Sequence, residues 1–385
     1  MKRTGLISSL GLLVLAGLAA APARAKHVPT VTEFPTPTPN SLAEGVDVAR
    51  DGSIWYCETL AGRLVLQRPD RGVVEYPVPN GGQPNTLKIG QDGIWFTDQT
   101  NNAIGVLHPE TGEVVEYRVP SGAQPTFIEL GPDGSVWFPE PNGVARMDPQ
   151  GHFTEWQIAL EKTTDGSHIE EISLDPAGRV WFAEKNYAGP GPDGTNTVRR
   201  LDPVTNLISE YRVPTLGGTP AGVLANADGT VWVTEFFGNA VALLDPSAAP
   251  HNDLTVTPSS GASAGQSTAG SHLHAGGVPR VAATPVVPRL TPVTPSRTPG
   301  WIEYPIPLAN ANAGDLRVDP SGRVWFEEDA GQIGVLDPVA LTITEYPLPT
   351  QGNGYYNIEI DHHGRIWITE AGYFGPPSKV AVLEP

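Results

Sequence analysis

The sequence predicts an all-β fold, a seven-bladed β-propeller built from four-stranded blades. Seven tryptophans are each followed three positions later by an acidic residue, and most of the intervals between them match the period of roughly 40–45 residues that is typical of propeller blades. The 43 glycines and 40 prolines in 385 residues fit many short strands joined by turns. After the N-terminal segment, no stretch has a sustained helical period.

Each repeat is long enough for four strands. In the second repeat we expect strands at 86–90, 93–98, 103–109 and 114–120, and the Asp-Gly pair at 92–93 suits the left-handed backbone of a tight hairpin. The second strand carries the tryptophan and ends at the acidic residue. We call these seven residues the strand-end acids: Glu58, Asp98, Glu140, Glu184, Glu235, Glu328 and Glu370.

The fourth strand of each blade has its own signature, a glutamate followed by an aromatic residue. Nearby prolines fit an outer edge strand, where a missing amide hydrogen does no harm. One copy, residues 32–37, precedes the first tryptophan repeat, and the chain ends at 379–385 on a third strand without a fourth. We therefore predict that the N-terminal copy completes the last blade and closes the ring, which removes exposed sheet edges.

One interval between tryptophans is about twice as long as the others because it contains residues 247–300. This segment is rich in Ser, Thr, Ala, Gly and Pro. We predict a low-complexity, disordered insertion within blade five, between its third and fourth strands. His272 and His274 in it form a possible metal-binding pair, but a loop without a fixed scaffold is the alternative that the composition favours.

Residues 1–25 have the pattern of a signal peptide: a basic start, an apolar run and Ala-Arg-Ala at 23–25. We expect cleavage near Ala25 and a periplasmic or secreted protein, with residues 26–385 as one propeller. A membrane anchor is the alternative, but the apolar run is short. Cleavage removes Lys2, Arg3 and Arg24, so the formal net charge changes from −18 to −21.

The acidic balance restricts the possible partners. A surface of this charge repels nucleic acid and anionic lipid, and no later segment is apolar enough to span a bilayer. We expect a monomer whose partner is a small molecule or a cation.

Carboxylates gather at the predicted ligand face. First strands of a propeller line the channel, and the ends of second strands lie near the usual ligand face. Carboxylate oxygens are the ligands that Mg²⁺ and Ca²⁺ prefer, and the candidate metal ligands are Glu44, Glu140, Glu170 and Glu184. For most strand-end acids the alternative is a structural role, in which the carboxylate accepts hydrogen bonds from backbone amides.

Residues that interrupt the repeat are candidates for a ligand site. His168 lies near the predicted ligand face and is a candidate acid or base. An aromatic wall on the same face is a candidate ligand surface, although local loop packing is the alternative. Its members are Tyr187, Phe236, Phe237, Tyr355, Tyr356, Tyr373 and Phe374.

Residues 92–120, DGIWFTDQTNNAIGVLHPETGEVVEYRVP, resemble the streptogramin B lyase (virginiamycin B lyase) family, and the resemblance recurs in every blade. It implies a seven-bladed propeller that opens a cyclic depsipeptide by elimination at its ester, with Mg²⁺. Such chemistry needs a general base that removes a proton next to a carbonyl, and a cation that stabilises the enolate.

The resemblance also implies two histidines at the starts of the last two first strands and a glutamate two residues before the second. The matching positions here are Gly314, Tyr356 and Gly354. Glu370 matches the family's last glutamate, and we take it with His168 as a catalytic candidate.

Three functions therefore stay open. The first is a propeller that binds a small ligand or a divalent cation, Mg²⁺ or Ca²⁺, without catalysis. The second is a divergent Mg²⁺-dependent carbon–oxygen lyase. The third is a Ca²⁺-dependent hydrolase of the lactonase type, in which Asn85 and Asn357 would serve as channel ligands.

Overall fold

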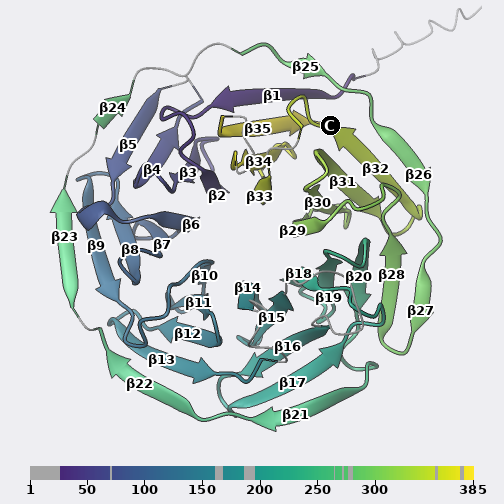
Figure 1. The fold of residues 1–385 in the computed structure, drawn as a ribbon, viewed down its shortest axis with the longest axis horizontal. Helices are drawn as coiled ribbons and strands as arrows, with labels where there is room; N and C mark the ends of the chain where they lie inside the picture. The colour runs from purple at the N-terminus through teal and green to yellow at the C-terminus, as the bar shows by residue number, and fades with distance from the viewer. Residues whose placement is uncertain are drawn as a thin grey trace, which may run out of the picture.

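The computed structural model describes residues 27–69, 72–160, 168–185, 196–263, 265–270, 273–275, 281–351, 354–372 and 377–385. Seven antiparallel sheets surround a central channel (Figure 1), which confirms the predicted seven-bladed propeller. Within these residues the only helical element is one 3-10 turn, η1 (Pro79–Gly81). None of the described helices is long and apolar enough to cross a membrane.

Four strands of each blade follow the sequence repeat from the channel outward. Blades 1 to 3 contain β2 (Ala43–Val48), β3 (Ile54–Glu58), β4 (Arg63–Gln67) and β5 (Val73–Pro77); β6 (Pro84–Ile89), β7 (Ile94–Asp98), β8 (Ala103–His108) and β9 (Glu113–Arg118); β10 (Glu129–Leu130), β11 (Val136–Glu140), β12 (Gly143–Met147) and β13 (His152–Gln157). Blades 4 and 5 contain β14 (His168–Leu174), β15 (Val180–Lys185), β16 (Thr197–Asp202) and β17 (Leu207–Arg212); β18 (Pro220–Ala225), β19 (Val231–Glu235), β20 (Ala240–Leu244) and β28 (Trp301–Pro305). Blades 6 and 7 contain β29 (Ala313–Val318), β30 (Val324–Glu328), β31 (Gln332–Asp337) and β32 (Thr342–Pro347); β33 (Tyr355–Ile360), β34 (Ile366–Glu370), β35 (Lys379–Glu384) and β1 (Thr30–Pro35).

The N-terminal strand closes the ring as predicted. β1 pairs with β35 in antiparallel register from Thr30 opposite Glu384 to Pro35 opposite Lys379. Blade 7 is therefore built from both ends of the described chain, and the backbone hydrogen bonds between them hold the ring shut.

The repeated tryptophan packs on the aromatic residue of the fourth strand in its own blade. The rings of Trp137 and Trp156 stack with centroids 5.6 Å apart, and those of Trp55 and Tyr76 lie 5.5 Å apart. The other five blades have the same contact: Trp95–Tyr117, Trp181–Tyr211, Trp232–Tyr304, Trp325–Tyr346 and Trp367–Phe34. Aromatic pairs contribute about 0.5–1.5 kcal/mol beyond their burial, so the two sequence signatures recur together for a physical reason.

The turn before the second strand holds the indole ring of this tryptophan in one orientation. In blade 6, Asp319 accepts a hydrogen bond from the amide of Ser321 (2.9 Å) and another from the indole nitrogen of Trp325 (3.0 Å). Gly322 in the turn has a φ of 84°, which favours glycine. The Asp-Gly pair of blade 2 acts in the same way, because Asp92 accepts a hydrogen bond from the indole nitrogen of Trp95 at 3.0 Å.

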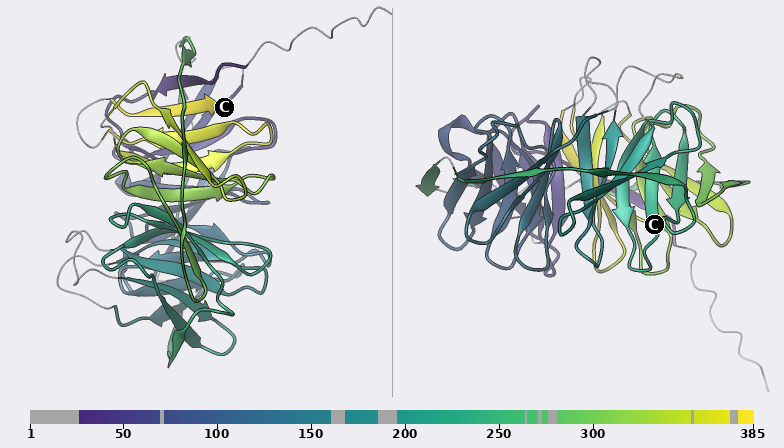
Figure 2. Two further views of the ribbon diagram at one scale, coloured as in Figure 1. Left: turned by 90° about the vertical axis from the view of Figure 1, so that its right-hand side faces the viewer. Right: turned by 90° about the horizontal axis from the view of Figure 1, so that it is seen from below.

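The insertion differs from the prediction of a disordered loop. Its described residues form seven strands, which we call the belt: β21 (His251–Thr255), β22 (Pro258–Ala262), β23 (Gln266–Gly270), β24 (Leu273–Ala275), β25 (Thr284–Pro285), β26 (Arg289–Pro292) and β27 (Ser296–Thr298). They pair in turn with the outer strands of blades 4, 3, 2, 1, 7, 6 and 5 and make every sheet five-stranded. The belt therefore circles the whole propeller before the chain completes blade 5 with β28 (Figures 1 and 2).

The edges of the blades explain why this polar segment is ordered. Each fourth strand would otherwise present unpaired amide and carbonyl groups along its outer side. Extended chain covers about 3.3–3.6 Å per residue, so a spacing of about seven residues between belt strands carries the chain from one outer strand to the next. Order comes from pairing with the edges, which the composition of the insertion does not reveal.

Valine side chains of the belt also enter the core between blades. Val286 is 7% exposed and packs in a cluster with Val31 of blade 7 and Trp325 of blade 6. Val293 is buried in the cluster that joins blades 5 and 6. The amide of Val286 donates to the carbonyl oxygen of Pro29 at 3.0 Å, beside the closing strand β1. The belt thus contacts junctions of the ring and not only its rim.

We predict that Val286→Ala lowers the free energy of unfolding by about 1–2 kcal/mol, because it removes two buried methyl groups and leaves a small cavity. Urea unfolding followed by tryptophan fluorescence measures the change. The matched control is Val287→Ala at the next position, whose side chain is 85% exposed; it should change stability by less than about 0.5 kcal/mol. Equal effects of the two substitutions would contradict the packed belt.

Candidate functional site

A β-bulge recurs near the start of the first strands. The register between first and second strands shifts in six blades, between Ala43 and Val46, Pro84 and Leu87, Ile169 and Ile172, Pro220 and Val223, Ala313 and Leu316, and Tyr355 and Ile358. A bulge leaves an extra residue unpaired and redirects side chains, and bulges are common beside active sites. In this ring they bring polar side chains to the channel.

Side chains of one first strand bind backbone amides of the next. This pairing satisfies inner strand edges that have no neighbouring strand. The bonds join Asp315 to the amide of Ile358 (3.0 Å), Asn357 to that of Val46 (2.9 Å), Asp47 to that of Ile89 (2.8 Å) and Ser173 to that of Ala225 (3.1 Å). Polar residues on the first strands therefore have a structural task in addition to any binding task.

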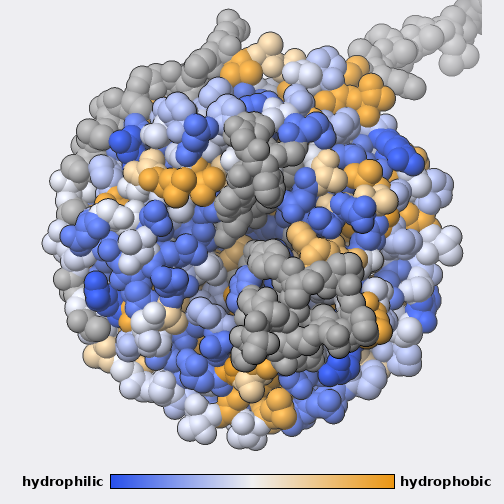
Figure 3. All heavy atoms as spheres, in the orientation of Figure 1, coloured by the Kyte–Doolittle hydropathy of each residue, from blue (hydrophilic) through white to orange (hydrophobic). Residues whose placement is uncertain are grey.

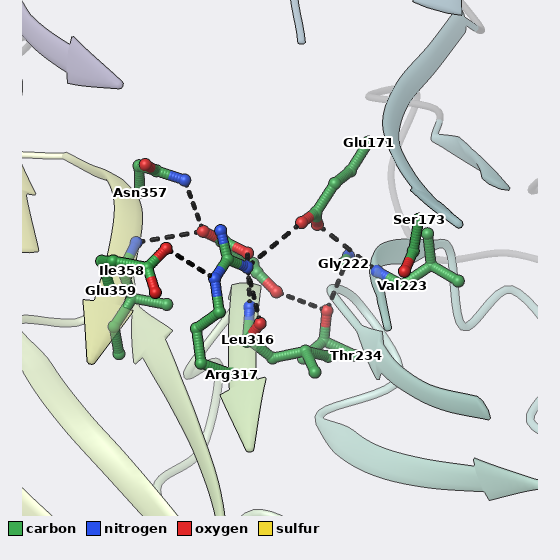
Figure 4. Close-up of polar contacts among 12 residues, drawn as sticks. Glu171, Ser173, Gly222, Val223, Thr234, Leu316, Arg317, Asn357, Ile358 and Glu359 are labelled. Carbon is green, nitrogen blue, oxygen red and sulfur yellow. Dashed lines mark hydrogen bonds and ion pairs between the residues drawn. The ribbon is translucent and has the colours of Figure 1, made fainter. Parts of the chain in front are cut away.

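Charged residues from four blades meet at Arg317 of β29. We call Lys88, Glu171, Asp315, Arg317 and Glu359 the channel cluster. The guanidinium lies 2.5 Å from an oxygen of Asp315, 3.1 Å from one of Glu359 and 3.5 Å from one of Glu171 (Figure 4). The ammonium of Lys88 lies 3.7 Å from Glu359. Charges and hydrogen bonds thus link blades 2, 4, 6 and 7 across the channel.

The cluster borders a hollow of about 200 Å³ in the channel. Its polar lining residues are Thr86, Lys88, Glu129, Glu171, Ser173, Arg317, Asn357 and Glu359. On the face of the molecule seen in Figure 3, hydrophobic residues appear only as small scattered patches. The lining of the hollow thus combines these polar side chains with apolar ones such as Leu87, Phe127 and Ile128.

Burial changes the protonation of two acids in the channel. It raises the pKa of Glu171 well above the ordinary glutamate value, nearby Asp315 raises it further, and Arg317 opposes the rise. Burial also raises the pKa of Asp47 to about 6, although Lys88 lowers it. Burial of Glu171 therefore favours its protonated form, whereas Arg317 favours its ionised form.

Contacts of the strand-end acids support their structural interpretation. Glu58 accepts a hydrogen bond from the amide of Thr38 (3.0 Å), and Asp98 accepts one from that of Gln83 (3.0 Å). In other blades it is the glutamate of the outer strand that accepts the amide of the incoming loop: Glu155 from Ser121, Glu303 from Thr215, Glu345 from Leu308 and Glu33 from Thr350. Buried or half-buried carboxylates thus anchor the loop that enters each of these blades.

Cations neutralise only some of these acids. Arg199 lies 2.7 Å from Glu184 and 2.8 Å from Glu210 in blade 4. Blades 1 and 7 have comparable pairs, Arg63 with Glu75 and Lys379 with Glu33. In blades 2, 3, 5 and 6, the described residues provide no such ion pair.

The acids without a cation have raised pKa values. Burial raises the pKa of Glu116 to about 7, and a contact with Asp98 adds to the rise. Burial raises the pKa of Glu140 to about 7 and, with help from Glu345, that of Glu328 to about 8. The pKa of Glu235 is raised well above its ordinary value by burial and by Glu303.

Three of the four candidate metal ligands have hydrogen-bond or ion-pair partners within the protein. Glu44 accepts hydrogen bonds from Thr59 (2.6 Å) and Asn85, Glu140 accepts one from Ser121 (2.7 Å), and Glu184 is paired with Arg199. The side chain of Glu170 lies outside the described residues. Across the described part of the chain, no group of three or more His, Cys, Asp or Glu side chains could hold a metal ion. The described side chains therefore form no ligand set for Mg²⁺ or Ca²⁺, and because that of Glu170 lies outside them, the cation site stays a prediction.

The other candidates are partly placed by the structure. Phe236 is 9% exposed, packs edge-on against Phe237 with centroids 5.0 Å apart and lies 4.6 Å from the ammonium of Lys185. Tyr187, Tyr373 and Phe374 lie outside the described residues, as do the side chains of Tyr355 and Tyr356, so the aromatic wall stays a prediction. The catalytic candidates lie in different blades: His168 begins β14 in blade 4, and Glu370 ends β34 in blade 7, fully buried.

Sequence reasoning missed the channel cluster. Asp315, Arg317 and Glu359 were not selected because neither the tryptophan signature nor the outer-strand signature includes them. A signal was present: charged residues occur within first strands, which line the channel and otherwise carry apolar or small residues.

The fold defines a class of protein, the seven-bladed propellers, here with charged residues at the central channel. The model of the Virginiamycin B lyase family matches residues 21–244, and the match ends with β20, just before the insertion. The chain belongs to the virginiamycin B lyase family. A virginiamycin B lyase of Nocardia farcinica is 27% identical over 210 residues, which cover 52% of this chain and 65% of that protein. The aligned part thus spans less than two thirds of that relative.

Solved structures have the same fold. A streptogramin B lyase structure has a TM-score of 0.68 at 22% identity and covers 93% of this chain and 98% of that chain. Virginiamycin B lyase from Staphylococcus aureus has a TM-score of 0.67 at 22% identity, over 92% and 99% of the two chains. A catalytically inactive histidine-to-alanine variant of it, solved with quinupristin, gives the same values.

The raised pKa values predict a protein that loses stability in alkali. A folded-state pKa of about 8 for Glu328, against an ordinary value of 4.5, means that folding favours the protonated acid. This stabilisation is fully present below pH 4.5 and is lost as the pH rises through 8. We expect Glu328→Gln to raise the free energy of unfolding at pH 9 relative to the parent, on the order of 2 kcal/mol, with little change at pH 4.

Urea unfolding at the two pH values checks this expectation. Glu184→Gln is the matched control, because Arg199 pairs with Glu184 and no such gain at pH 9 should appear. A gain for both variants, or for neither, would contradict the assignment of a proton to Glu328.

Proposed function

We propose that this protein binds a small ligand at the channel, with a polar group of the ligand inserted beside the channel cluster. The observation that carries this proposal is the convergence of Lys88, Glu171, Arg317 and Glu359, from four blades, on one polar hollow of about 200 Å³. A water molecule occupies about 30 Å³ of liquid, so the hollow suits one small polar group and not a whole peptide ring.

The charges around the hollow favour certain ligands. Glu129, Glu171, Asp315 and Glu359 outnumber Lys88 and Arg317. Complementary charge selects partners and rejects wrong ones, so a cationic group or a hydrogen-bond donor is favoured over an anion. The formal net charge of −18 acts in the same direction over longer distances.

Family membership supports a second function, carbon–oxygen lyase activity on a cyclic depsipeptide of the streptogramin B type. A base would take a proton from the carbon next to a carbonyl, and the bond from the adjacent carbon to the ester oxygen would break. No step is assigned to a metal, because the described acids do not fit one. A lactonase-type hydrolase is distinguishable: elimination leaves the mass of the opened product unchanged, whereas hydrolysis adds one water.

We also propose that the protein is exported as a monomer after cleavage near Ala25. The basic start, the apolar run and the Ala-Arg-Ala sequence of residues 1–25 support export. N-terminal sequencing of the protein recovered from the periplasm or medium tests the cleavage position.

Calorimetric titration of the protein with quinupristin tests ligand binding, and we expect a saturable heat. Glu171→Gln should weaken binding about tenfold, because the amide cannot reproduce the carboxyl group beside Arg317. Glu116→Gln replaces another buried acid with a raised pKa, outside the channel, and should leave binding unchanged. Separate titrations with Ca²⁺ and Mg²⁺ test the cation prediction. Absence of heat with millimolar quinupristin would contradict binding of this ligand class.

A further inference from the structure

A second hollow, of about 460 Å³, lies at the rim of blade 2, and we call it the rim hollow. The outer strand β9, the turn η1 and the belt strand β23 contribute to its lining. Figure 1 shows β23 along the outer side of β9. The rim hollow shares no lining residue with the hollow in the channel. Its volume lies within the range of about 300–1,000 Å³ that is usual for small-molecule sites.

Most side chains that line the rim hollow can form hydrogen bonds. The lining consists of Asn80, Asn101, Ala103, Glu116, Arg118, Gly265 and Ser267. Asn80 and Arg118 are exposed at the surface. Neither of their side chains has a hydrogen bond or an ion pair with another described residue. These two side chains are therefore available to a ligand.

The features that shape the rim hollow do not belong to the repeated structure. The strand-end acid of blade 2 is Asp98, whereas the other six are glutamates. The loop that enters blade 2 contains η1, the only helical element of the described residues. Asn101 holds this turn, because its side-chain amide donates to the carbonyl oxygen of Pro79 at 3.0 Å and to Asp98 at 2.9 Å. Blade 2 thus differs from the other blades at the place where the hollow lies.

The belt forms one wall of the rim hollow. Glu116, the outer-strand glutamate of blade 2, is 3% exposed and accepts a hydrogen bond from the hydroxyl of Ser267 at 2.7 Å. The outer-strand glutamates of the other six blades instead accept a loop amide or pair with a cation. The amide of Arg118 donates to the carbonyl oxygen of Gly265 at 3.2 Å. A propeller without the belt would lack this wall.

The chemistry of the lining suits a neutral ligand with several hydroxyl groups. The lining holds one acid, Glu116, and one base, Arg118, so neither sign of charge dominates as it does in the channel. Arg118 offers a planar fork of donors, and the side-chain amide of Asn80 offers both a donor and an acceptor. Hydroxyl groups both donate and accept hydrogen bonds, so neighbouring hydroxyls can bond to both residues.

The size of the rim hollow also fits such a ligand. A water molecule occupies about 30 Å³ of liquid, so 460 Å³ equals the space of about 15 waters. This space is enough for the roughly twelve non-hydrogen atoms of a hexose at the same spacing. A monosaccharide, or one end unit of a longer sugar chain, therefore fits the hollow.

We propose that the rim hollow is a carbohydrate-binding site, in which Arg118 and Asn80 bind hydroxyl groups of the sugar. The site is independent of the ligand that we propose for the channel. It lies between blade 2 and the belt, so the insertion contributes to binding as well as to the fold.

Calorimetric titrations with glucose, mannose, galactose and maltose test this site. We expect saturable binding of at least one of these sugars, with a Kd of about 1–10 mM. Arg118→Ala and Asn80→Gly should each weaken that binding at least about fivefold. Glycine is chosen at position 80 because the φ of 54° there suits it, so the turn is kept. Arg289→Ala is the control, at an exposed arginine of the belt in blade 6, and should leave binding unchanged.

Titrations with sodium acetate and methylammonium chloride distinguish a sugar site from a site that selects charge. Tighter binding of either ion than of the sugars overturns the assignment of the ligand, as does the absence of sugar binding at about 100 mM. Sugar binding that persists in both rim variants, or that is lost in Glu171→Gln of the channel, overturns the location. Sugar binding without any binding of quinupristin contradicts the channel proposal and supports the rim site.

Discussion

Backbone hydrogen bonding at the edges of the sheets is the constraint on which this structure depends. Seven radial sheets have fourteen edges, and each edge exposes amides and carbonyls that must find partners. At the rim the belt supplies a further strand to every blade. At the channel, where no strand is available, Asp47, Asp315 and Asn357 accept amides of the neighbouring blade. Polar residues in the channel are therefore required by the architecture, and the same residues are available for binding a ligand.

Charge balance then divides these polar residues into groups with different chemistry. Arg199 and Arg317 form ion-pair networks with nearby acids. Acids such as Glu328 and Glu235 have no cation in direct contact among the described residues, and burial raises their pKa values. Residues that recur in every blade have structural roles, and residues that differ between blades are the candidates for function.

Much of the fold could be predicted from the sequence because its signals are local. The tryptophan and the outer aromatic residue stack within one blade, so both recur at every blade, and the unmatched copy at 32–37 predicts the ring closure. The belt could not be predicted, because its Ser, Thr and Pro residues bury little surface and gain order from edges elsewhere in the chain. The candidate metal ligands were chosen for charge alone, and their partners, such as Arg199 for Glu184, become visible only in the folded ring. Arg317 of blade 6 meets Glu171 of blade 4 and Glu359 of blade 7 only after these blades are placed around the channel.

The length of the belt also matches the number of blades in the propeller. It leaves blade 5, passes every other blade once and returns to blade 5, so its length must equal the perimeter of the ring. A ring with one blade more or fewer would need a belt longer or shorter by about seven residues, or roughly 25 Å of extended chain. The number of blades and the length of the insertion are thus coupled, and neither can change in evolution without the other.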